Sequence, residues 1–460
     1  MLLPPRYRFA ALGLLISTAL LPAGICAERP LLDAPSAILS RIKAPEFPSR
    51  DFGIPGFGAM PGQDCTGAIA KAIAACHEAG GGRVVVPAGV WLTGAVHLRS
   101  HVNLFLEKGA TLRFLPESAK YLPVVLTRFE GIECMNYSPL IYAIEQEDVA
   151  VTGQGTLDGS ASLDTWWAWN NPAAGRPTKQ AAARQQLDQQ GADGTPVAER
   201  IYGEGKFLRP NFIQTYRCQN VLIQGVTIVN SPMWEIHPVL CTNVIVRGVR
   251  IRSLGTNNDG CDPESCRDVL IEDCVFETGD DCIAIKSGRN NDGRRVNVPS
   301  ENIVIRRCTM KDGHGGVTIG SEVSGGVRNV FVEDCKMDSP HLERAFRFKS
   351  NAVRGGVIEN IFMRKVDIGR VAKAVLSVEF DYEEGANGPN QPVLRNVQIE
   401  GVTSASSGSV AIITAFPGAV IEGIRLKDCT FSDVESADLL RHSGVLTFEN
   451  VTIAPTKKKK

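Results

Sequence analysis

Residues 220–226 read NVLIQGV, and residues 243–249 read NVIVRGV. Each stretch begins with asparagine, continues with two apolar residues separated by one position, and ends three positions later on valine. Residues two apart in a β-strand point to the same face of the sheet. Val221 with Ile223, and likewise Val244 with Val246, therefore predict short strands that bury one face.

The same phrase recurs along most of the chain. Further copies begin at Asp268, Asn302, Asn329, Asn360 and Asn396, a degenerate copy begins at Gly423, and earlier copies lie near Asn103 and Asp148. From residue 220 onward the copies start 23, 25, 34, 27, 31, 36 and 27 residues apart. A unit this short cannot bury its own face, so neighbouring units must stack. We expect an all-β fold, a single-stranded right-handed parallel β-helix of about ten coils, with loops of different length between its strands.

Two columns of this repeat are mostly apolar, which predicts that both point inward. Six residues after each start stand Val226, Val249, Cys274, Cys308, Cys335, Val366, Val402 and Cys429. Two residues before each start stand Cys218, Cys241, Cys266, Ser300, Val327, Ile358, Leu394 and Ile421. The chain has thirteen cysteines, and those in the columns fit small core hydrophobes. We predict no essential disulfide, and a contact between Cys261 and Cys282 stays open.

The first residues have the composition of a secretory signal. Arg6 and Arg8 precede an apolar core, residues 10–21, that is too short to span a bilayer. We expect residues 1–27 to be a signal peptide, residues 28–455 to form one β-helix domain and residues 456–460 to be a basic tail. Such a chain is expected to be secreted or periplasmic.

A capping helix is expected at the start of the β-helix. Asp64 predicts its N-terminal cap, and Glu78 lies near its end. The helix would bury one apolar side, formed by Ala68, Ile69, Ala72, Ile73 and Cys76. Covering the first coil would protect strand edges that are otherwise open.

The overall charge excludes some classes of partner. With 49 basic and 50 acidic residues the formal net charge is -1, so no strong field recruits nucleic acid or an anionic membrane. We expect neither as a partner, and we expect a monomer.

A second set of strands brings polar residues together. Residues 257–265 (NNDGCDPES), 279–287 (GDDCIAIKS), 313–321 (GHGGVTIGS) and 345–350 (AFRFKS) share a polar start, an apolar alternation and a final serine. In this register Asp259 lies over Asp281, and His314 occupies the column of Asp280. Arg347 and Lys349 follow on the next coil. Because coils stack ~4.8 Å apart, we expect these side chains to converge on one face.

These motifs, in this order, resemble the signature set of the polygalacturonases, glycoside hydrolase family 28, whose usual forms are NTDG, GDD, GHG and RIK. Here Asn258 replaces the threonine and Phe348 replaces the isoleucine. The resemblance covers most of the mature chain. Flanking text such as SPMWEIHP (231–238) and IGSEVSGGVRN (319–329) looks most like the exo-acting bacterial and plant branch.

The resemblance implies a role for each motif residue. Asp280 would be the general acid, and Asp259 and Asp281 would hold and activate water, which gives inversion with carboxyl groups ~6.5–9.5 Å apart. Crowding of carboxylates should raise one pKa. Further expected site residues are His314, which would position Asp280, and the substrate-binding Asn257, Arg347, Lys349, Tyr382 and His237. No cofactor or metal is expected.

Several residues fit two interpretations. Trp234 and His237 could equally pack in the core or form a platform for a sugar ring. Trp166, Trp167 and Trp169 could equally fold their long insertion or form the wall of a sugar subsite. Arg289, Arg294 and Arg295 fit a solvated loop, and capture of a substrate carboxylate is the alternative.

The implied function is hydrolysis of α-1,4-linked galacturonic acid in pectin. Two insertions, residues 160–210 and 289–300, predict a cleft closed at one end and therefore exo action from the non-reducing end. Two alternatives remain: a pectate lyase in which the three aspartates bind Ca²⁺, and a non-catalytic carbohydrate-binding β-helix. The substrate's fine structure, homogalacturonan or xylogalacturonan or rhamnogalacturonan fragments, stays open.

Overall fold

The computed structural model describes residues 34–171 and 177–457. The predicted signal peptide, residues 1–27, lies outside the described residues, and of the predicted basic tail only Thr456 and Lys457 are described. From Pro35 onward the chain forms one compact unit. No helix among the described residues is long and apolar enough to cross a membrane.

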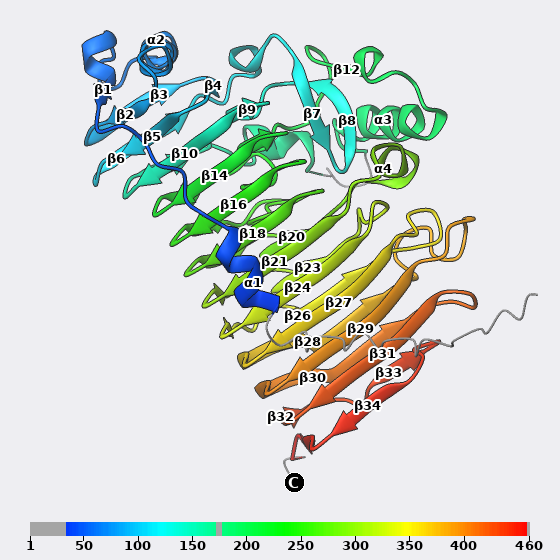
Figure 1. Cartoon of the computed structure of the whole chain (residues 1–460). Helices are drawn as coiled ribbons and strands as arrows, with labels where there is room; N and C mark the ends of the chain where they lie inside the picture. The colour runs from blue at the N-terminus through cyan, green and yellow to red at the C-terminus, as the bar shows by residue number, and fades with distance from the viewer. Residues whose placement is uncertain (1–33, 172–176, 458–460) are drawn as a thin grey trace, which may run out of the picture. The chain divides into compact units, whose positions relative to one another are not determined.

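The chain winds into a right-handed parallel β-helix, which confirms the predicted fold (Figure 1). Thirteen parallel strands form one sheet within the described residues, somewhat more than the ten or so coils expected. They are β1 (Asp51–Gly53), β2 (Gly82–Val86), β5 (Val102–Leu106), β10 (Glu147–Gly153), β14 (Gln219–Gln224), β16 (Thr242–Arg247), β18 (Arg267–Glu272), β21 (Ser300–Arg306), β24 (Val327–Glu333), β27 (Val357–Arg364), β29 (Val393–Glu400), β31 (Val420–Lys427) and β34 (Leu446–Glu449). The repeat phrases pair in the predicted register, for example Val221 with Val244.

A second sheet of sixteen strands within the described chain forms another side of the coils. Twelve of its strands are β3 (Gly89–Thr93), β6 (Ala110–Phe114), β11 (Thr156–Asp158), β15 (Thr227–Val229), β17 (Arg250–Ser253), β19 (Val275–Thr278), β22 (Thr309–Met310), β25 (Lys336–Met337), β28 (Asp367–Glu379), β30 (Thr403–Thr414), β32 (Thr430–Val434) and β35 (Thr452–Pro455). The other four are β20 (Ile283–Ile285), β23 (Val317–Ile319), β26 (Arg344–Lys349) and β33 (Leu439–Arg441).

A further row of strands carries the predicted site. It begins with β4 (Val96–His97), β9 (Ile141–Ile144) and β13 (Ile213–Tyr216). Single bridges continue it from Ile213 through Ile236 and Cys261 to Ile283, where β20, β23 and β26 follow. The motifs that share the polar start therefore lie on neighbouring coils of one face.

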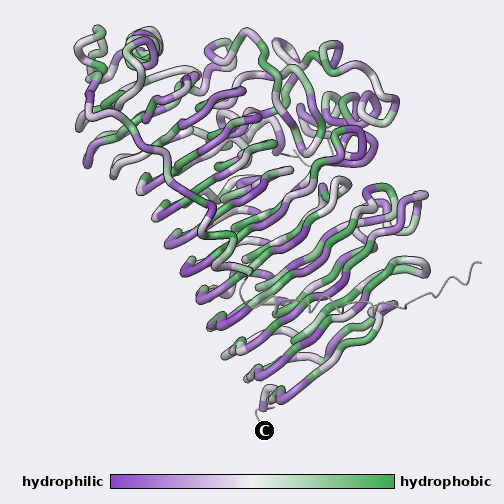
Figure 2. Tube along the Cα trace, in the orientation of Figure 1, coloured by the Kyte–Doolittle hydropathy of each residue, from purple (hydrophilic) through white to green (hydrophobic). Residues whose placement is uncertain are grey.

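The interior of the coils is apolar. Hydrophobic and hydrophilic residues alternate along the strands (Figure 2), and both predicted inward columns are buried. The twelve described cysteines are all buried and unpaired. Cys261 and Cys282 lie on adjacent coils and share a backbone hydrogen bond, Cys261 N to Cys282 O at 3.1 Å, without a disulfide.

The first residue of the repeat phrase forms a ladder along the outside of the coils. Asn220, Asn243, Asp268, Asn302, Asn329, Asn360 and Asn396 all have positive φ, between 55° and 59°. The amide of Asn302 donates to Asp268, that of Asn329 to Asn302, that of Asn360 to Asn329 and that of Asn396 to Asn360. In the degenerate copy Gly423 occupies the same position with φ 66°. Asparagine recurs because it tolerates this backbone and bonds to the next coil.

A helix covers the first coil, as predicted. It is α2 (Thr66–Glu78), and it contacts β1 and β2. The cap differs from the prediction, since the N-cap residue is Cys65, without a side-chain cap bond, and Asp64 stands one residue before it. Asp64 Oδ1 still accepts a hydrogen bond from the Thr66 amide at 3.0 Å, and Ile69, Ala72, Ile73 and Cys76 are buried beneath the helix.

The described residues before β1, 34–50, lie along the outside of later coils. They include α1 (Ala34–Arg41), drawn in front of β18 and β21 in Figure 1. Arg41 pairs with Asp268 at 2.7 Å. Lys43 exchanges two backbone hydrogen bonds with the side chain of Asn243, at 3.1 and 2.8 Å.

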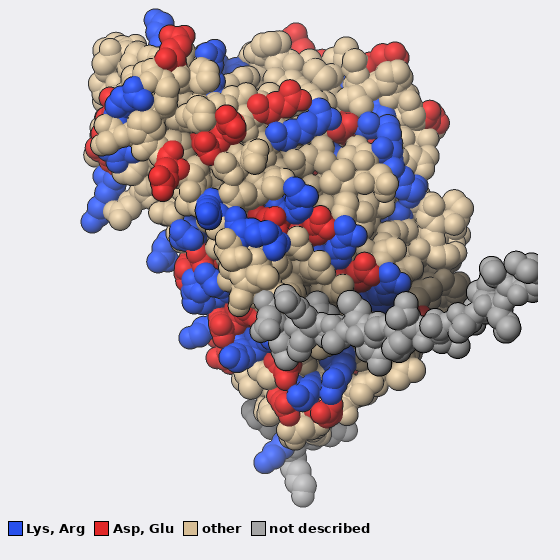
Figure 3. Space-filling model, viewed as in Figure 1, with Lys and Arg blue, Asp and Glu red and all other residues tan. Residues whose placement is uncertain are grey.

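Insertions form a lobe on one side of the coils. It contains the antiparallel hairpin of β7 (Val125–Phe129) and β8 (Ile132–Asn136), with β12 (Ile201–Tyr202) paired to β8. Two helices, α3 (Ala181–Asp193) and α4 (Asn290–Val296), contact each other and β8. Short 3-10 helices are η2 (Ile54–Phe57), η3 (Ser118–Tyr121), η4 (Trp166–Trp169) and η5 (Val197–Glu199). The surface of the viewed face mixes both signs of charge (Figure 3).

Candidate active site

The strand register brings the predicted acids together. Cys261 pairs with Ile283, and Ile283 pairs with Val317. Counting back two residues places Asp259 beside Asp281, and counting back three places Asp280 beside His314. Both alignments expected from the repeat are confirmed.

Asp259, Asp280 and Asp281 each offer one oxygen within 4.8 Å of the other two. This is closer than the ~6.5–9.5 Å expected for carboxyl groups of an inverting enzyme, because adjacent coils and adjacent positions on one coil are both at close range. The three side chains differ in exposure, which is 19% for Asp280, 4% for Asp259 and 0% for Asp281. Asp280 is therefore the acid most accessible from outside.

Asp281 is held as an anion. Its carboxylate lies 2.8 Å from Lys349 Nζ and 3.6 Å from Arg347 Nη1. Burial would raise the pKa of Asp281, but Lys349 and Arg347 outweigh burial and hold it well below its ordinary value. The charged form of Asp281, which can only accept hydrogen bonds, is therefore favoured.

The pKa of Asp259 is shifted in the opposite direction. Burial, followed by the charges of Asp262 and Asp280, raises the pKa of Asp259 well above its ordinary value, against the opposing charge of Lys286. The Lys286 Nζ lies 3.7 Å from Asp259 Oδ2. Crowding by neighbouring acids contributes to the raised pKa of Asp259, as expected, but burial is the larger cause.

His314 contacts the most exposed acid. Its Nδ1 lies 3.0 Å from Asp280 Oδ1, and 47% of the side chain is exposed. The hydrogen bond with Asp280 raises the pKa of His314 above its ordinary value. The imidazolium form, which donates to Asp280, is therefore favoured over a wider pH range than in a free histidine.

The two glycines beside His314 are required by close packing. Gly313 has φ 145°, and a side chain there would meet the Asp280 carbonyl at 2.4 Å. A Cβ on Gly315 would lie 2.2 Å from Thr318 Oγ1 and 2.8 Å from Asp281 Oδ1. The coil of the histidine can approach the coil of the acids only because both neighbours lack a side chain.

A cavity of about 380 Å³ opens over these groups. Asp259, Asp280, His314, Arg347 and Lys349 line it, together with Asn257 and Tyr382. Tyr382 lies beside Lys349, whose Nζ is 5.5 Å from the ring centroid. Asn257 is held in place, since its Oδ1 accepts hydrogen bonds from Arg209 at 2.8 Å and Asn170 at 3.1 Å. Most of the predicted site residues thus share one wall.

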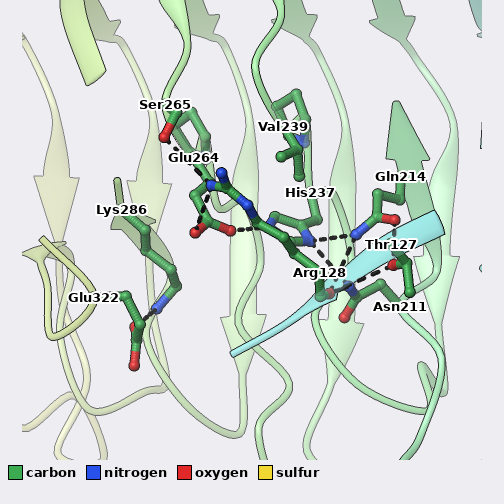
Figure 4. Close-up of polar contacts among 12 residues, drawn as sticks. Thr127, Arg128, Asn211, Gln214, His237, Val239, Glu264, Ser265, Lys286 and Glu322 are labelled. Carbon is green, nitrogen blue, oxygen red and sulfur yellow. Dashed lines mark hydrogen bonds and ion pairs between the residues drawn. The ribbon is translucent and has the colours of Figure 1, made fainter. Parts of the chain in front are cut away.

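His237 does not line the cavity, which corrects the expectation that it contacts substrate. The side chain is fully buried. Its Nε2 lies 2.8 Å from Glu264, and its Nδ1 lies 2.9 Å from the side-chain amides of Asn211 and Gln214 (Figure 4). Glu264 also pairs with the buried Arg128 of β7 at 3.0 Å. The hairpin covers this part of the row, so His237 belongs to the network that holds the hairpin.

Lys286 and Glu322 are site residues that the motif analysis missed. Both line the cavity, and Lys286 Nζ lies 3.1 Å from Glu322 Oε2 (Figure 4). Lys286 also lies 4.4 Å from the ring centroid of Trp234, so that ring packs against the ammonium group. The sequence does contain a signal for Lys286. It follows the strand of the GDD motif and, by register, occupies the same column as Lys349.

The three tryptophans of the first insertion fold that insertion rather than wall the cavity. Trp166 is buried and packs at 4.9 Å against Trp169. Trp167 donates its indole N–H to the Ser231 carbonyl at 2.8 Å. None of the three lines the cavity described above.

The arginines of the second insertion are occupied by protein groups. Arg294 donates to the carbonyls of Val353 and Arg354 at 3.1 and 2.9 Å. Arg295 pairs with Asp292 and Glu133. The loop is not simply solvated, because much of it is the helix α4, and direct capture of a substrate carboxylate by these two side chains is not supported by their positions.

One end of the cavity is closed by several segments that meet there. Glu130 at the hairpin tip pairs with Arg184 of α3 at 2.5 Å and with Arg289 at 3.1 Å. Glu383, from the coil after β28, lies 3.8 Å from Arg184. Glu130, Arg184 and Glu383 all line the cavity. Both insertions therefore contribute to a wall at this end.

The opposite end of the cavity continues into a second hollow. His314, Glu343 and Lys373 line both, and Leu254, Gly313, Pro340 and His341 line the hollow beyond them. A chain that enters the cavity has room to extend in this direction.

The three aspartates have the composition of a cation site. Their surroundings already supply positive charge, since Lys349 and Arg347 face Asp281 and Lys286 faces Asp259.

Comparisons with known proteins agree with this geometry. A family model described as "Glycosyl hydrolases family 28" matches residues 180–438. A "Probable polygalacturonase" of Vitis vinifera is 28% identical over 443 residues, covering 92% of this chain and 82% of that protein. An "Exo-poly-alpha-D-galacturonosidase" of Dickeya chrysanthemi is 27% identical over 335 residues, covering 69% of this chain and 55% of that protein. The crystal structure of a hyperthermoactive exopolygalacturonase from Thermotoga maritima superposes with a TM-score of 0.89 at 43% identity, covering 92% of this chain and 96% of that one.

Proposed function

Since this chain belongs to family 28 of the glycosyl hydrolases, we propose that it releases single galacturonic acid residues from the non-reducing end of its substrate. The chain is a glycoside hydrolase of the polygalacturonase type, and it hydrolyses the galacturonan of pectin.

Asp280 is the proposed general acid. It is the most exposed of the three aspartates, and His314 holds its carboxyl at 3.0 Å. A proton from Asp280 would pass to the glycosidic oxygen as the bond to the anomeric carbon breaks. Proton donors of this kind contribute roughly 10²–10⁴-fold to rate.

Asp259 and Asp281 are the proposed holders of the attacking water. Asp281 is fully buried and pairs with two cations, so it cannot reach a sugar carbon to form a covalent bond. A water molecule between the two carboxyl groups would bond to the anomeric carbon and give up its proton to a carboxylate. Attack by a held water, rather than by a carboxylate, is what gives inversion. The oxygens of Asp259, Asp280 and Asp281 nevertheless lie closer together than the carboxyl groups of inverting enzymes usually do.

Chain-end action is proposed because one end of the cavity is closed. An endo-acting cleft must be open at both ends, whereas here Glu130, Arg184 and Glu383 close one end and a hollow continues from the other. The terminal sugar would lie between the acids and this wall, and the rest of the chain would leave through the open end.

The product profile early in the digestion of polygalacturonate tests chain-end action. Release of monomer with a slow fall in viscosity is the expected result. A ladder of oligomers with a rapid fall in viscosity would show an open cleft and contradict the proposal.

Two measurements test the chemistry. Asp280→Asn is expected to reduce kcat by about 10³-fold or more while substrate still binds, and an unchanged rate would remove Asp280 from the mechanism. Proton NMR of the first product should show the β-anomer released from an α-linkage. Immediate appearance of the α-anomer would contradict inversion.

Export is proposed from the signal predicted at residues 1–27, and a monomer is proposed as the active state. Activity in the medium or periplasmic fraction of expressing cells, and the mass by light scattering, test these two proposals.

A further inference from the structure

The cationic side chains that line the cavity differ in how exposed they are and in how closely they pair with carboxylates of the protein. Lys286, Lys349 and Arg347 are 3%, 8% and 9% exposed, and each has a carboxylate partner at 3.1 Å or less. Arg347 makes two hydrogen bonds to Glu379, at 3.0 and 2.8 Å. These groups pair with the acids of the site and are largely buried, so they present less open surface to a substrate carboxylate than an exposed cation does.

Apart from His314, which holds Asp280, Arg184 and Lys373 are the cations of the cavity that remain substantially exposed. Arg184 is 38% exposed and lies at the closed end. Lys373 is 48% exposed, pairs with Glu343 at 2.8 Å and lies where the cavity meets the second hollow. They therefore lie on opposite sides of the catalytic acids.

Arg184 has donors to spare. Its Nε donates to Glu130 at 2.5 Å, and its Nη2 lies 3.8 Å from Glu383. Among the described residues its two terminal nitrogens make no hydrogen bond. A guanidinium carries five N–H donors in a planar fork that matches a carboxylate, so four of them can face the cavity.

The position of Arg184 is fixed by both insertions. α3 packs Gly191 against Ile132 of β8, where a Cβ would lie 3.3 Å from the isoleucine, and its last turn accepts a hydrogen bond from Asn291 of α4 at 2.9 Å. Glu130, the partner of Arg184, is held from the other side by Arg289 at 3.1 Å. A preorganised cation binds an anion without the cost of ordering a flexible side chain.

We propose that Arg184 binds the carboxylate of the terminal galacturonate and thereby makes the enzyme specific for chain ends that carry a free acid. This rests on the proposed chain-end action. The terminal sugar would otherwise face Glu130, Glu322 and Glu383, which line the same part of the cavity and would repel its carboxylate. Lys373 lies on the other side of the catalytic acids, where it would contact the sugars beyond the cleaved bond.

Two defined substrates test the assignment: trigalacturonate, and the same trimer with a methyl ester on its non-reducing residue. Arg184→Gln should lower kcat/KM for the free acid by roughly 10- to 100-fold, the range of a charge-assisted hydrogen bond. It should leave kcat/KM for the ester within about threefold of the unmodified enzyme. Lys373→Gln should lower kcat/KM for both substrates by the same factor.

Two further variants separate recognition from structure. Arg184→Lys keeps the charge and loses the planar fork, so it should recover part of the activity on the free acid. Arg113→Gln is the matched control, because Arg113 pairs with Asp158 at 3.0 Å outside the cavity, and it should change neither rate. An equal loss on both substrates in Arg184→Gln, or no loss, would overturn the proposal.

Failure of the chain-end proposal is distinguishable from failure of this one. Monomer release by the unmodified enzyme, with equal rates on the acid and the ester, would overturn the assignment of Arg184 and leave chain-end action standing. An oligomer ladder from the unmodified enzyme would overturn both.

Discussion

Lys286 separates two carboxylates at the centre of the site. It lies 3.7 Å from Asp259 and 3.1 Å from Glu322, and its ammonium opposes the rise in the pKa of Asp259. Removing this cation raises the pKa of Asp259 further, so a base that must be ionised becomes available only at higher pH. Lys286→Met should move the acidic limb of the kcat/KM pH profile upward by about one pH unit or more.

Two variants control for the loss of the side chain. Lys286→Arg keeps the charge and should leave the limb near its original position. In Lys286→Met/Glu322→Gln the buried carboxylate that would lose its partner is replaced by a neutral amide. The double variant should therefore fold, and the acidic limb should still move upward. A limb that stays in place in both methionine variants would mean that Lys286 does not influence the base.

Gly315 is a residue whose missing side chain matters. A methyl group there would lie 2.2 Å from Thr318 Oγ1 and 2.8 Å from Asp281 Oδ1. Gly315→Ala is expected to lower kcat by about 10²-fold through displacement of Asp281, with a smaller effect on KM. Gly67→Ala in α2 is the control for a glycine with open space around it and no positive φ, and the two variants should differ strongly in activity.

The sequence predicted some side chains well and others poorly, for a physical reason. Asp259, Asp281 and His314 follow from the strand register, since a repeat with a fixed period determines which residues are neighbours. Arg184 and His237 depend on where the insertions fold. His237 became a buried partner of Glu264 because the hairpin with Arg128 lies over it, and no repeat encodes that placement.

Strands of the long sheet are joined at their starts by the asparagine ladder. Asn302 donates to Asp268 at 3.1 Å, accepts from Asn329 at 3.0 Å and has φ 59°. Asn302→Ala loses both bonds and replaces asparagine, which tolerates the left-handed region, with alanine, which tolerates it less well. The free energy of unfolding should fall by about 2–4 kcal/mol, as measured by urea denaturation.

Glycine at the same position separates the two contributions. Asn302→Gly keeps the backbone conformation, as Gly423 does with φ 66°, and loses only the hydrogen bonds. Its loss should be smaller than that of alanine. Equal stability of the alanine variant and the unmodified protein would show that the ladder contributes nothing.

Regular elements were predictable where the repeat is regular. β14 and β16 have the expected register, and α2 was marked by its apolar side, although its N-cap is Cys65 rather than Asp64. α4 (Asn290–Val296) was not predicted, because NNDGRRV has no apolar periodicity and the helix is held by tertiary contacts such as Arg200 with Asp292 at 2.7 Å.

The molecule as a whole is held by stacking rather than by covalent links. All twelve described cysteines are buried thiols, in keeping with the prediction of no essential disulfide. A reducing agent should therefore leave the melting temperature unchanged, as measured by calorimetry. Thiol titration of the denatured protein should give the same count with and without prior reduction, and a lower count without reduction would reveal a bond.

The number of coils exceeded the expectation because the end coils lack the full phrase. β1 and β34 close the two ends of the long sheet. β34 reads LTFE, and its pairing with β31 begins at Leu446 opposite Ile424. Strands at the ends of a repeat array have one neighbour, so their residues are not constrained to the pattern of the interior.

The placement of α1 determines when the molecule can be completed. Arg41 meets Asp268 across 227 residues, and Lys43 meets Asn243 across 200. At ~5–20 residues per second a ribosome makes two hundred residues in roughly 10–40 s. During that interval the segment of Arg41 and Lys43 lacks these partners. It can make these contacts only after the middle coils exist, so this early segment is among the last described parts to reach its final position.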